Sequence, residues 1–198
     1  MNKSKRSSLR TFVIMFIFAI IVIPLYFFLR TRTTPLISEN ATKTEIETLL
    51  SKDITGNYPS TPKEVIKLYS RITKNLYNEK HDEETIEGLA KQLRSLFDDE
   101  LLEKNEYENY LLDLNVEMTD YRNASRTILS YMVEGNSSVV YWESEEKEYA
   151  SIIASYTLKE DNNFTKIYEN FVLRKDTEGN WKILGWGEAD KTEINSEN

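Results

Sequence analysis

Cysteine is absent from this 198-residue sequence, and histidine, proline and glycine are scarce, with one, four and six residues. Without cysteine the chain can form neither a disulfide framework nor a lipid-modified cysteine, and a metal site would have to consist of carboxylates and one imidazole. The glycines form neither a G-x-G-x-x-G phosphate loop nor a G-x-S-x-G nucleophile elbow. We therefore predict no enzyme activity, no catalytic residue, no metal site and no cofactor.

The single histidine and the acidic runs have structural explanations beside the functional ones. His81 would need a partner and a pocket to act as a base, and the acids at 82–84 beside it are typical of a helix start. The runs 98–100 and 143–148 could bind calcium weakly, but they lack the ligand spacing and central glycine of an EF-hand loop. We interpret both runs as solvated turns.

One long uncharged run lies near the N-terminus. Residues 11–29 carry no charge and would span about 28 Å as a helix, which matches the hydrocarbon core of a bilayer. The basic residues that flank this run are Lys3, Lys5, Arg6 and Arg10 before it and Arg30 and Arg32 after it. By the positive-inside rule, residues 1–10 form a cytoplasmic tail and the chain after the span is extracytoplasmic.

A cleaved signal peptide is the competing interpretation. Its apolar region usually covers only about 7–15 residues and ends at small residues. Here the run is longer and ends in Leu29-Arg30-Thr31-Arg32, without an A-x-A-like site. We favour an uncleaved single-pass anchor in the cell membrane. An exported domain without disulfides suits a bacterial cell envelope.

Charge separates sharply along the chain. All 33 acidic residues follow Arg32, together with 19 of the 25 basic ones, so residues 33–198 carry a formal net charge of −14. An acidic surface repels nucleic acid and anionic lipid headgroups. We exclude nucleic acid as a partner and expect membrane contact through residues 11–29 only.

The remaining chain divides into a tether at 30–53, a domain at 54–188 and a polar tail at 189–198. Apolar residues inside the tether, at 46, 49 and 50, would form one face of a short helix. Helical spacing then predicts three helices, at 61–77, 82–97 and 106–121. The first of them begins with Thr61 as its cap, Pro62 at the first helical position and Glu64 completing a capping box.

From Arg126 onward the period changes to two, which indicates strands. They are expected at 127–133, 138–143, 149–158, 166–174 and 181–186. Turn residues separate each strand from the next, including Gly135-Asn136-Ser137 after the first, so we predict an antiparallel meander. Helices followed by antiparallel strands indicate an α+β fold, with three helices packed on a curved sheet of about five strands.

The last two strands carry large apolar residues on both faces. Alternation places Ile167, Phe171 and Leu173 on one face of the first strand, with Tyr168 and Val172 on the other. In the second strand Trp181 and Ile183 share one face, and Leu184 and Trp186 the opposite one. We therefore expect both faces of this hairpin to be covered.

The order of elements and the closing hairpin resemble the nuclear transport factor 2-like superfamily, which has a cystatin-like cone fold. Its likeness rests on the ending Gly179-Asn180-Trp181-Lys182-Ile183-Leu184-Gly185-Trp186. Three further motifs resemble an uncharacterised family of single-pass membrane proteins of Gram-positive bacteria: Tyr58-Pro59-x-Thr61-Pro62-x-Glu64-Val65, Leu96-Phe97-Asp98-x-Glu100-Leu101-Leu102 and Leu173-Arg174-Lys175-Asp176. This resemblance implies a fold and a topology, but no known activity and no catalytic residues.

Some cone-fold relatives bind or transform small apolar molecules between helices and sheet. Enzymes resembling ketosteroid isomerase place an acidic base and a tyrosine donor in that cavity. The residues that could line such a cavity here, as a ligand-binding site, are Tyr69, Tyr131, Tyr156 and Trp186, and alternation places Glu169 on the same face as Phe171. The alternative is that these aromatic residues simply fill the core.

Our leading hypothesis from the sequence is a membrane-anchored extracytoplasmic protein whose domain serves as an interaction or scaffold module. The scaffold component of type-four secretion and conjugation machines has the same plan of tail, span and cone domain, which is an analogy of architecture. Partners would be an envelope protein or a second copy of the chain. Small-molecule binding in the cone is the alternative, and a cavity enzyme is a more distant one.

Overall fold

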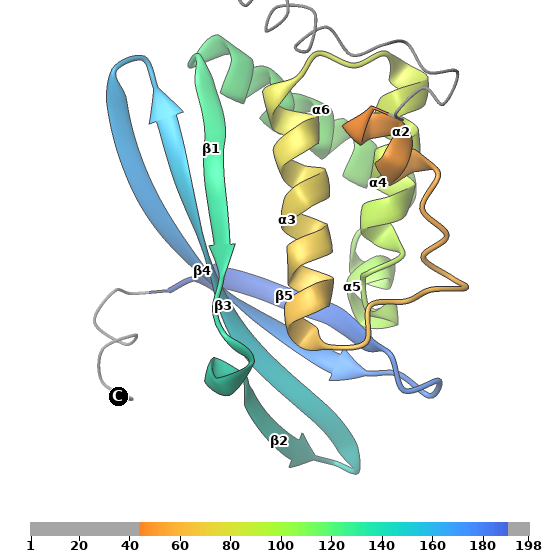
Figure 1. Cartoon of the computed structure of the whole chain (residues 1–198). Coiled ribbons are helices and arrows are strands. Elements are labelled where there is room, and N and C mark those ends of the chain that lie inside the picture. The colour runs from red at the N-terminus through yellow and green to blue at the C-terminus, as the bar shows by residue number, and fades with distance from the viewer. Residues whose placement is uncertain (1–43, 190–198) are drawn as a thin grey trace, which may run out of the picture. The chain divides into compact units, whose positions relative to one another are not determined.

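The computed structural model describes residues 44–189, in which five α-helices precede five β-strands (Figure 1). The helices are α2 (Glu45–Leu50), α3 (Pro62–Asn78), α4 (Glu83–Arg94), α5 (Asp99–Lys104) and α6 (Tyr107–Asn123). The strands are β1 (Arg126–Val133), β2 (Val140–Ser144), β3 (Lys147–Glu160), β4 (Asn163–Lys175) and β5 (Trp181–Glu188). The predicted α+β class, with helices packed on a five-stranded antiparallel sheet, is confirmed.

The three predicted helices are present as α3, α4 and α6. Thr61 caps α3 by accepting a hydrogen bond from the Glu64 amide at 3.2 Å, as expected. The capping box is incomplete, however, because the Glu64 carboxylate accepts its bond from the Ser60 amide at 3.1 Å, one residue earlier than predicted. The helix start expected at the acids 82–84 is confirmed, because Asp82 caps α4 by accepting a 2.9 Å bond from the Thr85 amide.

Two short helices accompany these three: α2, which is the short helix expected within the tether, and α5, which lies between α4 and α6. The first, α2, lies inside the span predicted as a tether, and it has a full capping box between Thr44 and Glu47. Its Leu49 is buried in the core, and the Gln92 side chain on α4 donates a 3.1 Å hydrogen bond to the Leu50 carbonyl. The second, α5, follows Asp98, where we expected a solvated turn. That expectation is wrong for Asp98, which is only 4% exposed and caps α5 through the Glu100 amide.

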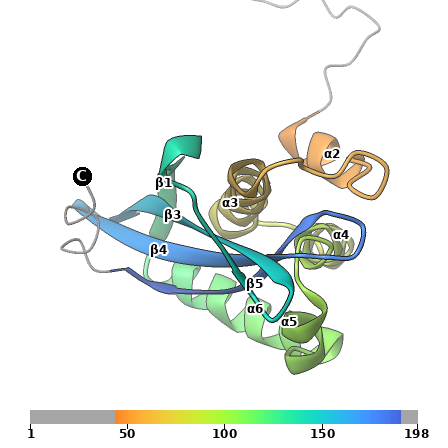
Figure 2. The same ribbon diagram turned by 90° about the horizontal axis from the view of Figure 1, so that it is seen from below.

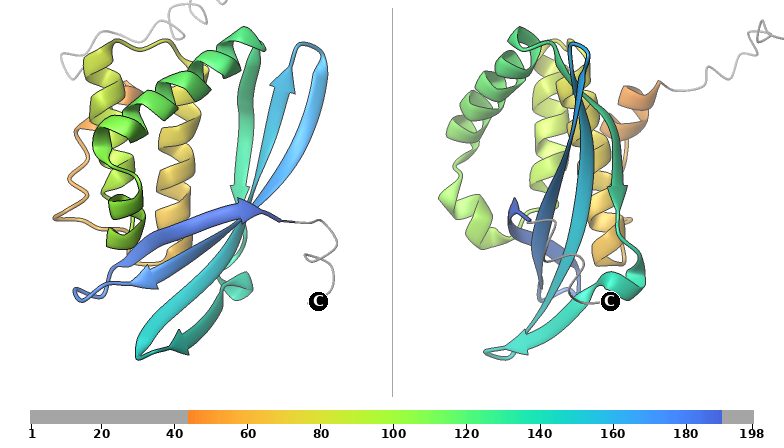
Figure 3. Two further views of the ribbon diagram at one scale, coloured as in Figure 1. Left: turned by 180° about the vertical axis from the view of Figure 1, so that it is seen from behind. Right: turned by 90° about the vertical axis from the view of Figure 1, so that its left-hand side faces the viewer.

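The sheet is not the simple meander that the turn residues predicted. Both β1 and β2 pair antiparallel with β3 along the same edge, so the chain does not reverse direction between them. Val133 lies opposite Ala154 and Val140 opposite Ser151, and the residues between the two strands, 134–139, leave the sheet as a short 3-10 turn. The first edge is therefore one interrupted strand, which Figure 3 shows bending away at its lower end.

The predicted faces of the last strand are wrong, because β5 contains a bulge. Leu173 pairs with Ile183 and Val172 with Gly185, so Leu184 has no opposite residue. A bulge of this kind shifts the alternation by one residue. Trp186 consequently lies opposite Phe171, on the same face as Ile183 and not on the opposite face.

The helices of the described chain lie on the concave side of the bent sheet, and α3 crosses it (Figures 1 and 2). Phe171, Leu173 and Ile183 from the sheet are fully buried against Ile72 and the other apolar residues of the helices. On the convex side Tyr168 and Val172 are only half-buried. Our expectation that both faces are covered is therefore wrong for residues 44–189, because the helices there occupy one face.

Asn78 at the end of α3 holds the interrupted edge strand in place. Its side-chain amide donates to the Ile128 carbonyl at 2.8 Å, and its side-chain oxygen accepts from the Ile128 amide at 2.7 Å. Leu129 next to this residue is bulged out of the ladder with β3. The paired bonds thus fix the position of Ile128 where the strand is irregular.

The predicted membrane span at 11–29 lies outside the described residues. Between residues 44 and 189, none of the helices has both the length and the apolar character needed to cross a bilayer.

Candidate functional site

A cavity lies between α3, α6 and the sheet. It consists of two adjoining parts of about 340 Å³ each. Five residues line both parts: Tyr69, Thr73, Tyr77, Glu117 and Trp186. The first part extends towards α4 and α5, and the second towards β1, β3 and β4.

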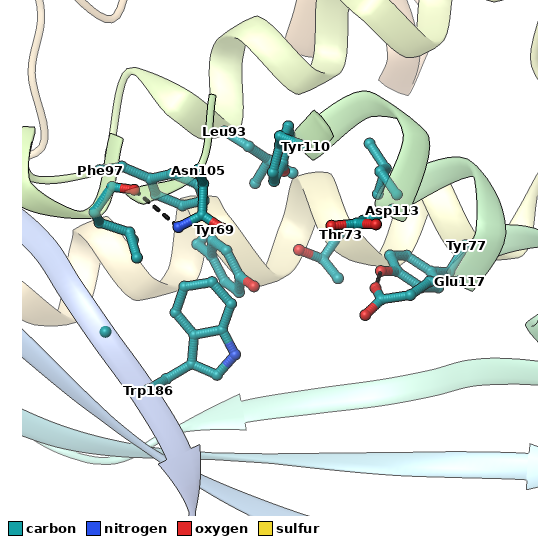
Figure 4. A pocket seen from close by; sticks show the side chains of 13 residues that line it. Tyr69, Thr73, Tyr77, Leu93, Phe97, Asn105, Tyr110, Asp113, Glu117 and Trp186 are labelled. Carbon is teal, nitrogen blue, oxygen red and sulfur yellow. Dashed lines mark hydrogen bonds between the residues drawn. The ribbon is translucent and has the colours of Figure 1, made fainter. Parts of the chain in front are cut away.

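Aromatic rings form one end of the cavity, where α3 faces β5 (Figure 4). The ring centroid of Tyr69 lies 5.4 Å from that of Trp186 and 5.3 Å from that of Phe171. Phe97 stands 5.9 Å from Trp186 and 6.0 Å, edge to face, from Tyr110. Trp186 remains 40% exposed, so these neighbouring rings do not cover it completely.

Thr73 lies on α3 between the aromatic end and the acidic end of the cavity (Figure 4). Its Oγ1 atom is buried and has no hydrogen-bond partner in the described part of the chain. A buried hydroxyl without a partner costs free energy, on the order of 1–3 kcal/mol.

Carboxylates line the other end. Glu117 on α6 accepts a hydrogen bond from the Tyr77 hydroxyl, and Asp113 and Asp120 flank it on the same helix. Glu169 enters from β4 and is half-buried. Burial, with a smaller contribution from the nearby Glu117 charge, raises the pKa of Glu169 from 4.5 to about 7.

One cationic side chain belongs to the described lining. Arg126, at the start of β1, forms an ion pair with Glu160 at 2.7 Å, and its guanidinium lies 5.2 Å from the centre of the Tyr121 ring. Its charge is thus already balanced. The electrostatic character of the cavity is set by the four acids at 113, 117, 120 and 169.

Three of the four residues named from the sequence do line this cavity, namely Tyr69, Tyr156 and Trp186. Tyr131 does not. It lines a separate surface groove beside Arg71, on the other side of α3 from the cavity. Glu169 lies in the cavity, as the alternation in β4 predicted.

Sequence reasoning missed Thr73, Tyr77 and Glu117. The signal for Glu117 was present, since it lies three residues after Leu114 and four before Tyr121 on the predicted apolar stripe of α6. An acid within such a stripe indicates a polar site next to the core. Thr73 and Tyr77 carry no comparable signal, because both are ordinary on a buried helix.

His81 and the acidic runs do not contribute to the cavity. At the end of α3, the Nε2 atom of His81 lies 2.9 Å from the carbonyl oxygen of Asn75. In the described range of residues, no group of three or more histidine, aspartate or glutamate side chains is arranged to hold a metal ion.

Fold and site together define a small α+β domain whose helices and bent antiparallel sheet enclose an aromatic, acidic cavity. The chain belongs to the family described as Domain of unknown function (DUF6715), which matches residues 1–186. No curated protein matches the chain significantly. Among solved structures, it is distantly similar to the solution structure of TraH from the Gram-positive conjugative plasmid pIP501, with 14% identity, a TM-score of 0.37, and 67% of this chain and 96% of TraH covered.

Proposed function

We propose that this chain is a membrane-anchored extracytoplasmic protein whose domain, of the nuclear transport factor 2-like type, holds a small molecule in its cavity. The anchor would be residues 11–29, with the N-terminus in the cytoplasm. The observation that carries the proposal is the cavity itself, whose two parts share a lining of Tyr69, Thr73, Tyr77, Glu117 and Trp186. This places binding ahead of the scaffold hypothesis that the sequence alone favoured.

The size and lining of the cavity support binding. Small-molecule sites usually have volumes of about 300–1,000 Å³, apolar walls and a few convergent polar groups. Each part here has about 340 Å³ and combines rings of Tyr69 and Trp186 with the Thr73 hydroxyl and the Glu117 carboxylate. Because Trp186 and Glu117 are exposed at its rim, the cavity can be entered from solvent.

Two of the tyrosine hydroxyls at the cavity are already engaged, and this favours binding without turnover. An enzyme resembling ketosteroid isomerase needs a tyrosine donor free to bond the substrate oxygen beside the acidic base. Here the Tyr156 hydroxyl shares a 2.8 Å hydrogen bond with Ser70 Oγ, and the Tyr77 hydroxyl donates to Glu117. Glu169 has a raised pKa, but neither Tyr156 nor Tyr77 has a hydroxyl free to act with it on a ligand.

The test uses N-phenyl-1-naphthylamine, a neutral aromatic probe whose emission rises in apolar surroundings. The purified full-length chain should bind it, and Thr73→Phe should weaken binding about tenfold or more, because the new ring fills the junction of the two cavity parts. Thr119→Phe, the same change on the exposed side of α6, should leave binding unchanged.

Amide chemical shifts of the unmodified protein provide a second measurement that needs no variant. Shifts on probe addition should concentrate at Tyr69, Thr73, Glu117 and Trp186. No binding, or equal loss of binding in both phenylalanine variants, would contradict the proposal. Conversion of an added unsaturated ketone by the protein would favour the enzyme alternative.

Self-association is the second candidate function, and β2 is the observation that favours it. This strand lies at the edge of the sheet, pairs with β3 only among the described elements, and exposes Val140, Tyr141 and Trp142. Trp142 stacks on Tyr149 with ring centres 5.5 Å apart, which holds it outward on the convex side. An exposed edge strand with apolar residues can pair with the same strand of a second copy.

If β2 is such an interface, the full-length chain should form dimers in sedimentation velocity at concentrations of hundreds of micromolar. Trp142→Glu should shift these dimers to monomers, because it buries a charge in the interface, whereas Thr119→Glu on α6 should not. A strictly monomeric protein over this range would exclude β2 as a self-association surface.

A further inference from the structure

We propose that the ligand of the cavity is an organic cation, an ammonium group carried on an apolar or aromatic body. This inference rests on the proposed binding function and adds the chemical class of the ligand. It follows from the combination of ring faces and carboxylates around one space, and from the pairing of the one arginine in the described lining.

The charge of the lining selects against anions. Asp113, Glu117, Asp120 and Glu169 face the two cavity parts from α6 and β4. Arg126 is engaged by Glu160 and so offers no unbalanced positive charge to a carboxylate or phosphate. An anionic ligand would meet repulsion from both walls, whereas a cation would be attracted by each of them.

The ring faces provide the second part of the site. Cations bind over the faces of tryptophan and tyrosine rings within about 6 Å of the ring centre. The domain already uses this contact where its own cations reach a ring, as with Lys182 over Tyr58 at 4.1 Å and Arg94 over Tyr110 at 5.2 Å. Within residues 44–189, no lysine or arginine occupies the rings of Tyr69 or Trp186, which border the cavity.

The aromatic end and the acidic end of the cavity are arranged to hold one amphipathic molecule. Tyr69 and Trp186 form the aromatic end, and Glu117 lies at the other end with Thr73 between them (Figure 4). The ammonium group would lie where the two ends meet, over a ring face and towards the carboxylates, and the apolar body of the ligand would pack on the remaining rings.

Proton linkage follows from the position of Glu169. Titratable and charged groups surround it from every neighbouring element: Tyr69 and Tyr77 on α3, Glu117, Asp120 and Tyr121 on α6, Arg126 on β1, Tyr156 on β3, and Glu188 opposite it on β5. A bound cation favours the ionised carboxylate. Cation binding should therefore weaken as the pH falls from 8 to 6 and release protons near neutral pH.

Three probes of similar size and different charge test the inference: the 2-phenylethylammonium ion, 2-phenylethanol and phenylacetate. Isothermal titration calorimetry of the full-length chain at pH 8 should give an ammonium affinity about tenfold or more above that of the alcohol, with phenylacetate weakest. Glu169→Gln should reduce the preference for ammonium over alcohol. Glu143→Gln, on exposed β2 away from the cavity, should leave it unchanged.

The outcomes separate this inference from the binding function on which it rests. Equal or stronger binding of the alcohol or of phenylacetate would overturn the cation assignment, while the cavity would remain a binding site. The assignment also fails if the ammonium ion does not bind but N-phenyl-1-naphthylamine does. If neither that neutral probe nor any of the three compounds binds, the binding function itself is excluded.

Discussion

Replacing Asp98 with alanine should lower the free energy of unfolding by about 3–5 kcal/mol, measured by denaturant unfolding at neutral pH. The Arg174 side chain is only 16% exposed and donates to both Asp98 oxygens, with the Nε bond at 3.0 Å. Removing the carboxylate would leave this guanidinium buried without its main partner. The same change also removes the cap of α5.

Asp98 also belongs to the segment that closes one edge of the sheet. Its amide donates to the Ile183 carbonyl at 2.8 Å, and the Ile183 amide donates to the Leu96 carbonyl at 2.8 Å. These bonds hold the link between α4 and α5 against β5, next to Phe97 and the aromatic end of the cavity. We therefore expect Asp98→Ala to weaken ligand binding as well as stability.

Glu100→Gln is the matched control for this prediction. Glu100 contacts the same arginine at 3.3 Å, but its side chain is 47% exposed. Exposed ion pairs contribute little to stability, so this variant should unfold nearly as the unmodified protein does. If Asp98→Ala and Glu100→Gln had equal effects, the burial of the Asp98–Arg174 pair would not be what stabilises this region.

Glu169→Gln should make the protein more stable at pH 8, by about 1–3 kcal/mol, and leave its stability unchanged at pH 4. The pKa of Glu169 is about 7 in the folded state, above its ordinary value of 4.5. The folded state therefore binds the proton more tightly, and stability is full below 4.5 and falls as the pH rises through 7. The difference corresponds to about 3 kcal/mol, an upper value because the side chain is half-buried.

Thermal or denaturant unfolding of both proteins across pH 4–9, without added ligand, measures this effect. The two stability curves should separate between pH 4.5 and 7 and stay parallel above that range. Glu143→Gln, on the exposed strand β2, should follow the unmodified protein throughout. If the Glu169→Gln protein is instead less stable at pH 8, the ionised carboxylate is stabilised by a partner in the cavity, and its burial does not lower the stability of the protein.

Local patterns in the sequence determined most of the secondary structure. The helices α3, α4 and α6 follow from apolar spacing and from the Thr61 and Asp82 caps, which act within one turn of the chain. Alternation identified the strands and placed Glu169 on the concave face. Periodicity succeeds here because the side-chain direction in a regular element depends on neighbours close in sequence.

Irregularities in the strands were not predictable in this way. The interruption between β1 and β2 looked like a hairpin turn because Gly135 and its neighbours are turn residues in either case. The bulge at Leu184 shifts Trp186 to the cavity side, although strict alternation placed it on the other face. Both depend on how a strand fits its partner and the layer above it, and such a fit is a property of the packed sheet.

The sequence by itself determined the α+β class, the acidic character of residues 33–198, and the absence of cysteine chemistry, because each depends on composition or short-range order. Only the tertiary structure joined Asp98 to Arg174, 76 positions away, although both stand in motifs visible in the sequence. It also created the cavity and brought Thr73, Glu117, Glu169 and Trp186 around it. A cavity is a gap left by packing, and its lining is therefore set by contacts between distant segments, which no local pattern encodes.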